Sequence, residues 1–381
     1  MNLTRRLFSQ TALSSATMLA AASIGRAAYA QSGKIVLGQS CPLTGAAAQL
    51  GIQFNAGASV FFDLLNAKGG VGGRQIEIAA MDDAYDPARC ADNTAKLIER
   101  DVFALFGYIG TPTSLAALPL ATKANLPFIA PFTGAMSLRD PFNKLAFHLR
   151  ASYDDETAAI VSQLNALGLK NIALFYQNDA YGKAGLDGTT KALAKFNNKP
   201  VALATVERNS VDVSAAVKTL VAAKPDAIIQ VSAYKSCAAL IREARKAGFG
   251  GQFFNVSFVG TKALADELGK EAAGIVVTQV VPSPFNTATV VTREFQAAVA
   301  AHGKNVSINY SSFEGYLAAK MFADGLSRSA GRASREGLIS GLEAIGRSDY
   351  GGFQLSLSGR DHVASSFVEK SMLTSDGKVR V

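Results

Sequence analysis

The sequence has little of what most enzymes use for acid–base chemistry. Its 381 residues contain no tryptophan, three cysteines and three histidines, and the histidines are far apart. No Gly-x-Ser-x-Gly motif is present, so a Ser-His-Asp hydrolase has little support. No Cys-x-x-Cys pair occurs either, which argues against the common zinc sites. We therefore expect a protein that binds rather than catalyses, without a metal or a cofactor.

Long hydrophobic runs and blocks of basic residues are also missing. The stretch from Thr11 to Gly25 is interrupted by serines and is shorter than the ~20 apolar residues of a spanning helix. Because Arg5-Arg6 precedes it and Ala28-Tyr29-Ala30 follows it, residues 1–30 are expected to be a cleaved signal peptide of the twin-arginine type. The mature protein would then be periplasmic. Its Lys and Arg residues are interleaved with acids, so no nucleic-acid partner is expected.

From Lys34 onward, short apolar runs alternate with helical patterns. This alternation predicts an α/β fold with parallel strands covered by helices on both faces, a doubly wound arrangement. The strands are expected around residues 35–37, 76–81, 102–106, 128–129, 172–175, 227–229, 275–277, 353–357 and 367–369.

The length of the chain predicts two such units, because one hydrophobic core rarely exceeds ~250–300 residues. The chain is expected to cross between them near residues 149–153, at the proline-rich segment 281–284 and near residues 348–352. The predicted lobes are residues 31–149 with 283–350, and residues 150–282 with 351–381. The whole is expected to be a monomer.

The three cysteines allow one disulfide in an oxidising compartment. Cys41 follows the first predicted strand, and Cys90 opens the helix after the second. If those strands are neighbours, both cysteines lie at one rim of the sheet and a bridge between them is plausible. Cys237 shares helical spacing with Leu240, Ile241 and Ala244, which indicates a buried helix face.

In open α/β sheets, ligands bind beyond the carboxyl ends of the strands. The loops predicted there are rich in hydroxyl groups, aromatic rings and glycine. Thr111 could meet a carboxylate at a helix N-terminus, or it could merely cap that helix. Thr133 could be a contact or a turn residue. Tyr181 and Tyr234 could be contacts or rim aromatics.

Two other motifs are less promising as sites. The glycines of segment 68–73 follow a helix and precede a strand, the reverse of a phosphate-binding loop. The acidic segment Asp82–Asp86 could mimic a cation site, but strand-end polar residues and a helix cap explain it better.

Several segments together resemble one family across nearly the whole mature chain. They are Pro42-Leu43-Thr44-Gly45, residues 66–74, Asp82-Asp83-Ala84-Tyr85-Asp86-Pro87, Asp179-Ala180-Tyr181-Gly182 and Phe313-Glu314-Gly315-Tyr316. The sequence resembles the leucine/isoleucine/valine-binding proteins, the type I periplasmic binding proteins of ABC importers. The resemblance implies two lobes joined by crossing strands, a cleft that closes on a small organic solute, and an inner-membrane ABC permease as partner. A sensory module that presents the solute to a receptor is the alternative.

Carried over by residue, the resemblance implies a ligand site made from both lobes. A ligand carboxylate would lie at Thr111, Thr133 and Gly134, and second-lobe contacts would come from Tyr181 and Tyr234. The aromatic residue that often flanks the ligand is replaced by Leu50.

One departure from the family concerns the ligand's charge. Where amino-acid binders carry an acid for the ligand ammonium, this chain has Ser257. Burying an ammonium without a counter-charge costs several kcal/mol. The preferred solute is therefore expected to lack an obligatory α-ammonium, unless Asp83, Asp154 or Glu156 replaces the missing acid.

Overall fold

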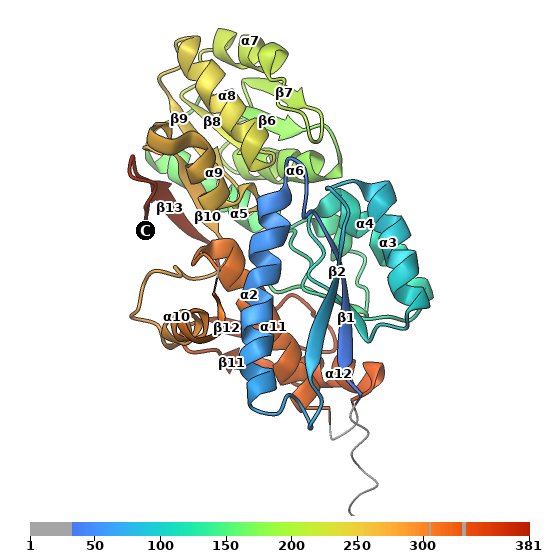
Figure 1. Cartoon of the computed structure of the whole chain (residues 1–381). Helices are drawn as coiled ribbons and strands as arrows, with labels where there is room; N and C mark the ends of the chain where they lie inside the picture. The colour runs from blue at the N-terminus through green and yellow to red at the C-terminus, as the bar shows by residue number, and fades with distance from the viewer. Residues whose placement is uncertain (1–32, 305, 330–332) are drawn as a thin grey trace, which may run out of the picture.

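The computed structural model describes residues 33–304, 306–329 and 333–381. The expected signal peptide lies outside the described residues. Among the helices that are described, none combines the length and apolar character needed to cross a membrane. The described chain forms two large sheets of mainly parallel strands with helices packed on both faces, and a two-stranded antiparallel hairpin, which confirms the predicted fold class (Figure 1).

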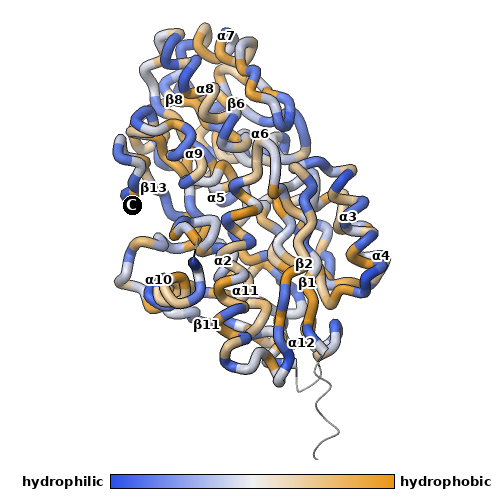
Figure 2. Tube along the Cα trace, viewed as in Figure 1, coloured by the Kyte–Doolittle hydropathy of each residue, from blue (hydrophilic) through white to orange (hydrophobic). Residues whose placement is uncertain are grey.

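The first sheet has the strand order β2-β1-β3-β4-β5, and all its pairings are parallel. Its strands are β1 (Ile35–Cys41), β2 (Ile76–Asp82), β3 (Ala104–Phe106), β4 (Phe128–Ile129) and β5 (Ala146–Phe147). Its helices are α2 (Ala48–Ala67), α3 (Pro87–Glu99), α4 (Thr111–Lys123), α11 (Tyr310–Ser327) and α12 (Arg335–Glu343). Apolar residues are concentrated along β1 and α11, and α11 is buried on nearly all sides (Figure 2).

The second sheet has the order β14-β13-β10-β9-β8-β6-β7. Its parallel strands are β6 (Ile172–Gln177), β7 (Ala202–Val206), β8 (Ala227–Val231), β9 (Gln252–Asn255) and β10 (Val276–Gln279), and β13 (Glu369–Leu373) and β14 (Val379–Arg380) extend it antiparallel. Its helices are α5 (Tyr153–Ala166), α6 (Ala180–Ala194), α7 (Ser214–Ala222), α8 (Tyr234–Lys246) and α9 (Thr261–Leu268).

The chain passes between the sheets three times. The first two passages run from β5 to α5 and from β10 to α10 (Val290–His302). The third does not lie near residues 348–352, because that segment is the turn of a hairpin between β11 (Gly346–Asp349) and β12 (Gln354–Leu357). Gly351 and Gly352 have φ of 81° and 104° there. The amide of Ala364 still donates to His148 O beside the first sheet (2.7 Å), so the chain crosses only after Ala364.

Candidate functional site

The N-terminus of α4 carries the first group of predicted site residues. Gly110 is the N-cap, with φ of 95°, and no side chain caps this helix. The hydroxyl of Thr111 instead lies 2.6 Å from the hydroxyl of Thr133. Thr111 is therefore not the cap of its own helix. Its side chain meets a loop from the neighbouring strand, and both threonines are buried.

Gly134, next to Thr133, lies where the two sheets approach each other. A Cβ atom at Gly134 would be 2.7 Å from the backbone N of Tyr153. Tyr153 begins α5, and its amide donates to Gly134 O (2.8 Å). The absence of a side chain at Gly134 thus allows the first helix of the second lobe to lie directly against the Thr111–Thr133 pair.

Aromatic rings continue this contact into the second lobe. The ring centroid of Tyr181 lies 5.3 Å from that of Tyr153 and 4.6 Å from that of Phe258. Phe258 in turn lies 5.8 Å from Phe132 of the first lobe. Tyr181 is placed by Asp179, which caps α6 by accepting from the Tyr181 amide (2.9 Å). We call Phe132, Tyr153, Tyr181 and Phe258 the interlobe aromatic cluster.

Buried polar atoms at this cluster lack hydrogen-bond partners. Within the described part of the chain, the hydroxyls of Tyr153 and Tyr181 and the Nη1 atom of Arg150 have none. Burial raises the pKa of Tyr153 to about 12, so its hydroxyl stays protonated. An unpaired buried polar group costs ~1–3 kcal/mol, so three such atoms on residues of the interlobe contact favour a polar ligand there.

Arg150 is held rigidly in the first passage between the sheets. Its Nε and Nη2 atoms donate to the two carboxylate oxygens of Glu314 on α11 (2.8 and 2.7 Å). Its guanidinium carbon lies 3.9 Å from the centroid of the Phe132 ring. This pairing leaves only Nη1 free, in contact with the interlobe aromatic cluster.

Ser257, where the resemblance leads one to expect an acid, is directly bonded to one. Its amide and hydroxyl donate to the carboxylate of Glu156 (2.7 and 3.0 Å), and the Thr278 hydroxyl donates to the same group. Burial raises the pKa of Glu156, whereas the nearby charge of Arg150 and these hydrogen-bond donors lower it. The other two acids are engaged elsewhere, Asp154 with Lys191 (3.1 Å) and Asp83 with Ser40 (2.8 Å).

Leu50 and Tyr234 lie on another side of the interface. A Cβ atom at Gly260 of the second lobe would be 2.3 Å from the Leu50 side chain on α2. Tyr234 begins α8 and is nearly fully buried, close to Gln49 of α2. Both residues therefore pack between the lobes, but their contacts run to α2 and Gly260 rather than to Thr111 and Thr133.

Strand-end loops were predicted to hold Thr111, Thr133, Gly134, Tyr181 and Ser257. In the structure these loops lie at the contact between the two lobes. No site role was assigned to Arg150 or Tyr153 from the sequence, and Glu156 was named only as an alternative to the missing acid. Arg150 and Tyr153 belong to the predicted first crossing, residues 149–153, and this position could have indicated them. A segment that joins two lobes lies beside the space between them.

The cysteines are free thiols in the structure, so the bond expected between Cys41 and Cys90 is not formed in it. Both are buried, and the Cys90 thiol donates to Thr113 O (3.4 Å). Burial raises the pKa of both thiols. Cys237 is buried on α8, as its spacing predicts.

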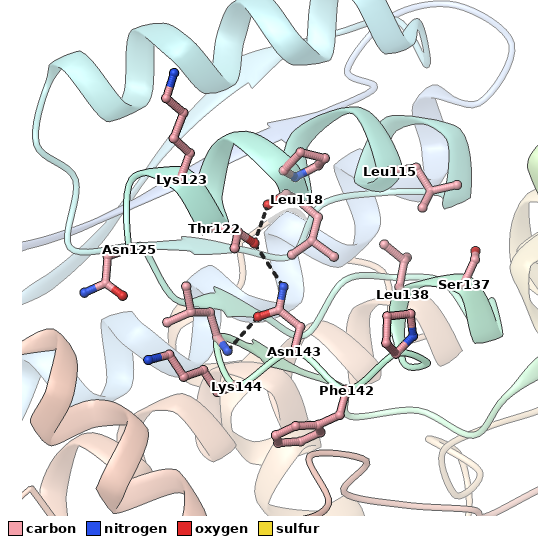
Figure 3. A pocket seen from close by; sticks show the side chains of 13 residues that line it. Leu115, Leu118, Thr122, Lys123, Asn125, Ser137, Leu138, Phe142, Asn143 and Lys144 are labelled. Carbon is pink, nitrogen blue, oxygen red and sulfur yellow. Dashed lines mark hydrogen bonds between the residues drawn. The ribbon is translucent and has the colours of Figure 1, made fainter.

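An open groove of about 920 Å³ lies on the outer side of the first lobe (Figure 3). It is lined by the second half of α4 and by residues 137–145. Two of its polar side chains are paired with each other, since Asn143 donates to the Thr122 hydroxyl (2.9 Å) and also accepts from the Leu145 amide (3.0 Å). None of the predicted site residues lines it.

Two lobes, three connecting passages and buried polar atoms between them define a two-lobed solute-binding protein. Residues 34–368 match the family model described as periplasmic binding protein, and the chain belongs to this family.

Solved structures and curated proteins are similar to the chain. A "possible leucine/isoleucine/valine-binding protein" from Rhodopirellula baltica is 35% identical, with a TM-score of 0.87 over 92% of this chain and 96% of that one. A substrate-binding periplasmic protein from Ralstonia solanacearum is 30% identical, with a TM-score of 0.85 over 91% and 99%. An amino acid binding protein of Pseudomonas aeruginosa is 26% identical over 62% of this chain, and the match spans 63% of that protein.

Proposed function

We propose that this protein is the periplasmic solute-binding component of an ABC importer, and that it encloses a small organic carboxylate between its lobes. The observation that carries the proposal is the set of unpartnered, buried polar atoms of Arg150, Tyr153 and Tyr181 at the contact of the two lobes, counted over the described residues. Relatives named for the binding of leucine, isoleucine and valine support a solute of this size. The proposed protein acts as a monomer and delivers its solute to an inner-membrane permease.

The carboxylate end of the solute is assigned to the first lobe. The N-terminus of α4 presents backbone amides whose dipoles favour an anion. The hydroxyls of Thr111 and Thr133 lie beside it. Arg150, although paired with Glu314, adds an Nη1 donor that has no hydrogen-bond partner among the described residues. Charge-assisted hydrogen bonds of this kind are about twice as strong as neutral ones.

The body of the solute is assigned to the interlobe aromatic cluster, which offers apolar faces from both lobes. We further propose that the preferred solute lacks an obligatory α-ammonium. The carboxylate of Glu156 lies beside Ser257, but it already accepts three hydrogen bonds from Ser257 and Thr278. An ammonium would have to displace these donors before it could be neutralised, which offsets much of the gain.

The first experiment identifies the solute class. Thermal-shift assays pair leucine, valine and phenylalanine with their deaminated 2-oxo and 2-hydroxy acids. We expect stabilisation by the acids. Micromolar binding of an amino acid, with its deaminated partners inert, would contradict the proposal on the ammonium and assign its recognition to Glu156.

The second experiment tests the carboxylate site. Thr111→Val and Thr133→Val each remove one hydroxyl, and calorimetry should show affinity for the best solute of the panel lowered by ~1–3 kcal/mol. Thr190→Val is the matched control, because its hydroxyl bonds only to Leu186 O on the exposed side of α6. Unchanged affinity in both site variants would place the ligand elsewhere.

A further inference from the structure

The loop Asp82–Asp86, between β2 and α3, holds two successive residues in the left-handed region. Ala84 has φ of 49° and Tyr85 has φ of 61°. For residues other than glycine, this conformation costs ~1–2 kcal/mol each. A strained pair of this kind persists only where its surroundings hold it in place.

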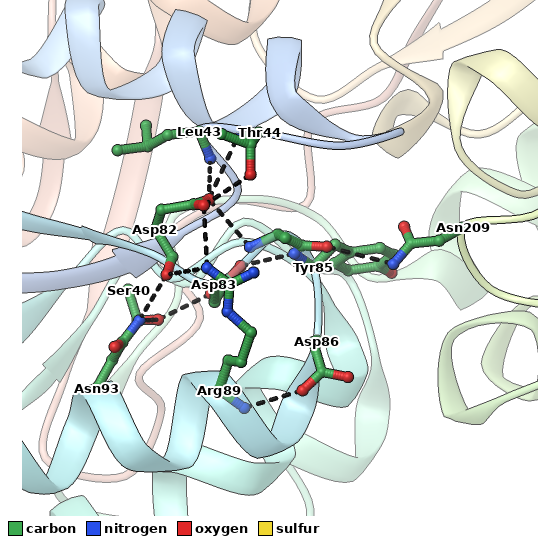
Figure 4. A network of polar contacts seen from close by, with 11 residues as sticks. Ser40, Leu43, Thr44, Asp82, Asp83, Tyr85, Asp86, Arg89, Asn93 and Asn209 are labelled. Atoms are coloured by element: carbon green, nitrogen blue, oxygen red, sulfur yellow. Dashed lines mark hydrogen bonds and ion pairs between the residues drawn. The ribbon is translucent and has the colours of Figure 1, made fainter.

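Two carboxylates of the same loop maintain the strained pair. The amide of Ala84 donates to Asp82 Oδ1 (3.0 Å), and the amide of Tyr85 donates to Asp83 Oδ1 (2.8 Å) (Figure 4). Asp82 is itself fixed by the amides of Leu43 and Thr44 (2.8 and 3.1 Å). Although partial burial opposes ionisation, these bonds and the Thr44 hydroxyl hold the pKa of Asp82 well below its ordinary value.

The strained conformation turns this loop toward the second lobe. Asn209, which follows β7, donates its side-chain amide to Ala84 O (3.2 Å) (Figure 4). Gln177, at the end of β6, donates to the Tyr85 hydroxyl (3.4 Å), and the Tyr85 ring centroid lies 5.9 Å from that of Phe258. The loop thus makes three contacts that span the two lobes.

The contact between Asn209 and Ala84 joins loops that follow edge strands of the two sheets, β7 and β2. β2 is one edge of the first sheet, and β5, from which the chain first crosses, is the other edge. β7 is likewise an edge strand of its sheet. A contact far from a hinge opposes opening with the greatest leverage, whereas a contact beside the hinge changes little when the lobes rotate.

The same loop also touches the proposed carboxylate site. A Cβ atom at Gly110 would be 2.3 Å from the Tyr85 ring, so the ring lies against the N-cap of α4. Tyr85 therefore lies between the anion-binding end of the first lobe and Phe258 of the second. A shift of this ring would alter both the site and the interlobe contact.

We infer that the loop Asp82–Asp86 is an interlobe latch, in which Ala84 O bonded to Asn209, and Tyr85 packed between Gly110 and Phe258, stabilise the closed arrangement. The inference rests on the proposed closure around a solute. Asn209 and Tyr85 are positioning residues in this scheme, because they set the population of the closed form. A smaller closed population lowers the apparent affinity for the solute in proportion.

Asn209→Asp tests the latch with an almost isosteric change. It replaces the donating amide by a carboxylate that repels Ala84 O, and Asp tolerates the φ of 63° found at this position. The matched control is Asn198→Asp, since the Asn198 amide donates to Lys170 O (2.9 Å) within the second lobe. Both variants lose a hydrogen bond from a side-chain amide to a backbone carbonyl, but only one of these bonds spans the lobes.

Distances between the lobes are measured with spin labels at Lys96→Cys on α3 and Lys218→Cys on α7, both exposed, while the native cysteines are buried. Each protein is measured alone and with the solute of the panel that stabilises the parent most. We expect Asn209→Asp to reduce the ratio of closed to open protein about tenfold, the equivalent of one hydrogen bond, and Asn198→Asp to match the parent.

Three results would overturn the latch. They are equal distance distributions for parent and Asn209→Asp, an equal shift in the control variant, and a parent that has no closed component under either condition. If no solute of the panel binds but Asn209→Asp still opens the protein, the latch stands and the proposed solute class fails. If a solute compacts the parent and Asn209→Asp alike, the binding function stands and the latch fails.

Discussion

Asp83 is a buried carboxyl whose ionisation costs stability. Burial raises its pKa to about 6, against the opposing hydrogen bonds from Ser40 and Tyr85, while Asp82 and Cys90 are the nearby titratable groups. Because the folded pKa lies above the unfolded value of 3.8, the folded protein binds the proton more tightly. The contribution of Asp83 to stability is therefore fully present below about pH 4 and is lost as the pH rises to about 6.

Asp83→Asn should remove this dependence. We expect the free energy of unfolding of the parent, relative to the variant, to fall by up to ~3 kcal/mol between pH 4 and pH 7, as two pKa units imply. Urea unfolding at a series of pH values measures it, and taking the difference between the proteins cancels the other titrating groups. A difference that is constant over this range, or that grows with pH, would contradict the assignment.

The disulfide between Cys41 and Cys90 stays a prediction, because both residues are free thiols in the structure. We expect protein exported to an oxidising periplasm to carry the bridge, because Cys90 lies close enough to Cys41 to contribute to its raised pKa. Alkylation after denaturation without reductant, followed by mass measurement, should then modify Cys237 alone. Three modified cysteines would exclude the bond.

At the residue scale, the sequence allowed prediction of the groups that belong to strand-end loops. Thr111 and Thr133 could be found because parallel strands end at one edge of a sheet. The bonds from Ser257 to Glu156 join residues 101 positions apart, and no local pattern indicates them. The sequence also does not predict that Arg150 Nη1 lacks a partner, because this depends on the hydrogen bonds from the other guanidinium nitrogens to Glu314 of α11.

Helices α2 and α11 pack at backbone contact through glycine. A Cβ atom at Gly315 of α11 would be 2.0 Å from Phe54 O on α2, and one at Gly57 of α2 would be 1.7 Å from Ser312 O. Both oxygen atoms belong to the backbone, so no side-chain rotation can make room. The close approach allows α11 to lie buried against α2 in the centre of the first lobe.

Gly315→Ala should therefore destabilise the protein, although Gly→Ala in an ordinary helix stabilises by ~0.5–1 kcal/mol. We expect the free energy of unfolding in urea to fall by at least ~1–3 kcal/mol, the usual cost of overpacking. The sign of the change is the test. An unchanged or higher stability would show that the two helices can separate at no cost.

At the scale of elements, alternation and length predicted most strands of both sheets. β7 was missed because its side chains alternate between half-buried and exposed positions at a sheet edge. The short strands β5, β9 and β14 were missed as well. The third crossing was misplaced because glycines that close a hairpin look, in sequence, like a linker between lobes. The pairing of strands distinguishes a hairpin turn from a linker, and a single sequence does not show which strands pair.

For the whole molecule, the two lobes and three passages imply a hinge that opens and closes. In the structure the rings of Tyr85, Tyr181 and Phe258 are fully buried between the lobes. A solute can reach the buried atoms of Tyr153 and Arg150 only if these rings separate. On the proposed function we therefore expect the structure to correspond to the closed form, and binding to require an open form.

Small-angle scattering with and without a saturating solute should show a smaller radius of gyration in the bound protein. Because the chain has no tryptophan, its intrinsic fluorescence comes from tyrosines, of which Tyr85, Tyr153 and Tyr181 lie at the lobe contact. Their emission should change at the same solute concentration as the compaction, since the same movement buries them. Asn209→Asp should need more solute to reach the same compact state. Identical scattering curves at saturation would exclude closure, and a fluorescence change without compaction would restrict the response to the site itself.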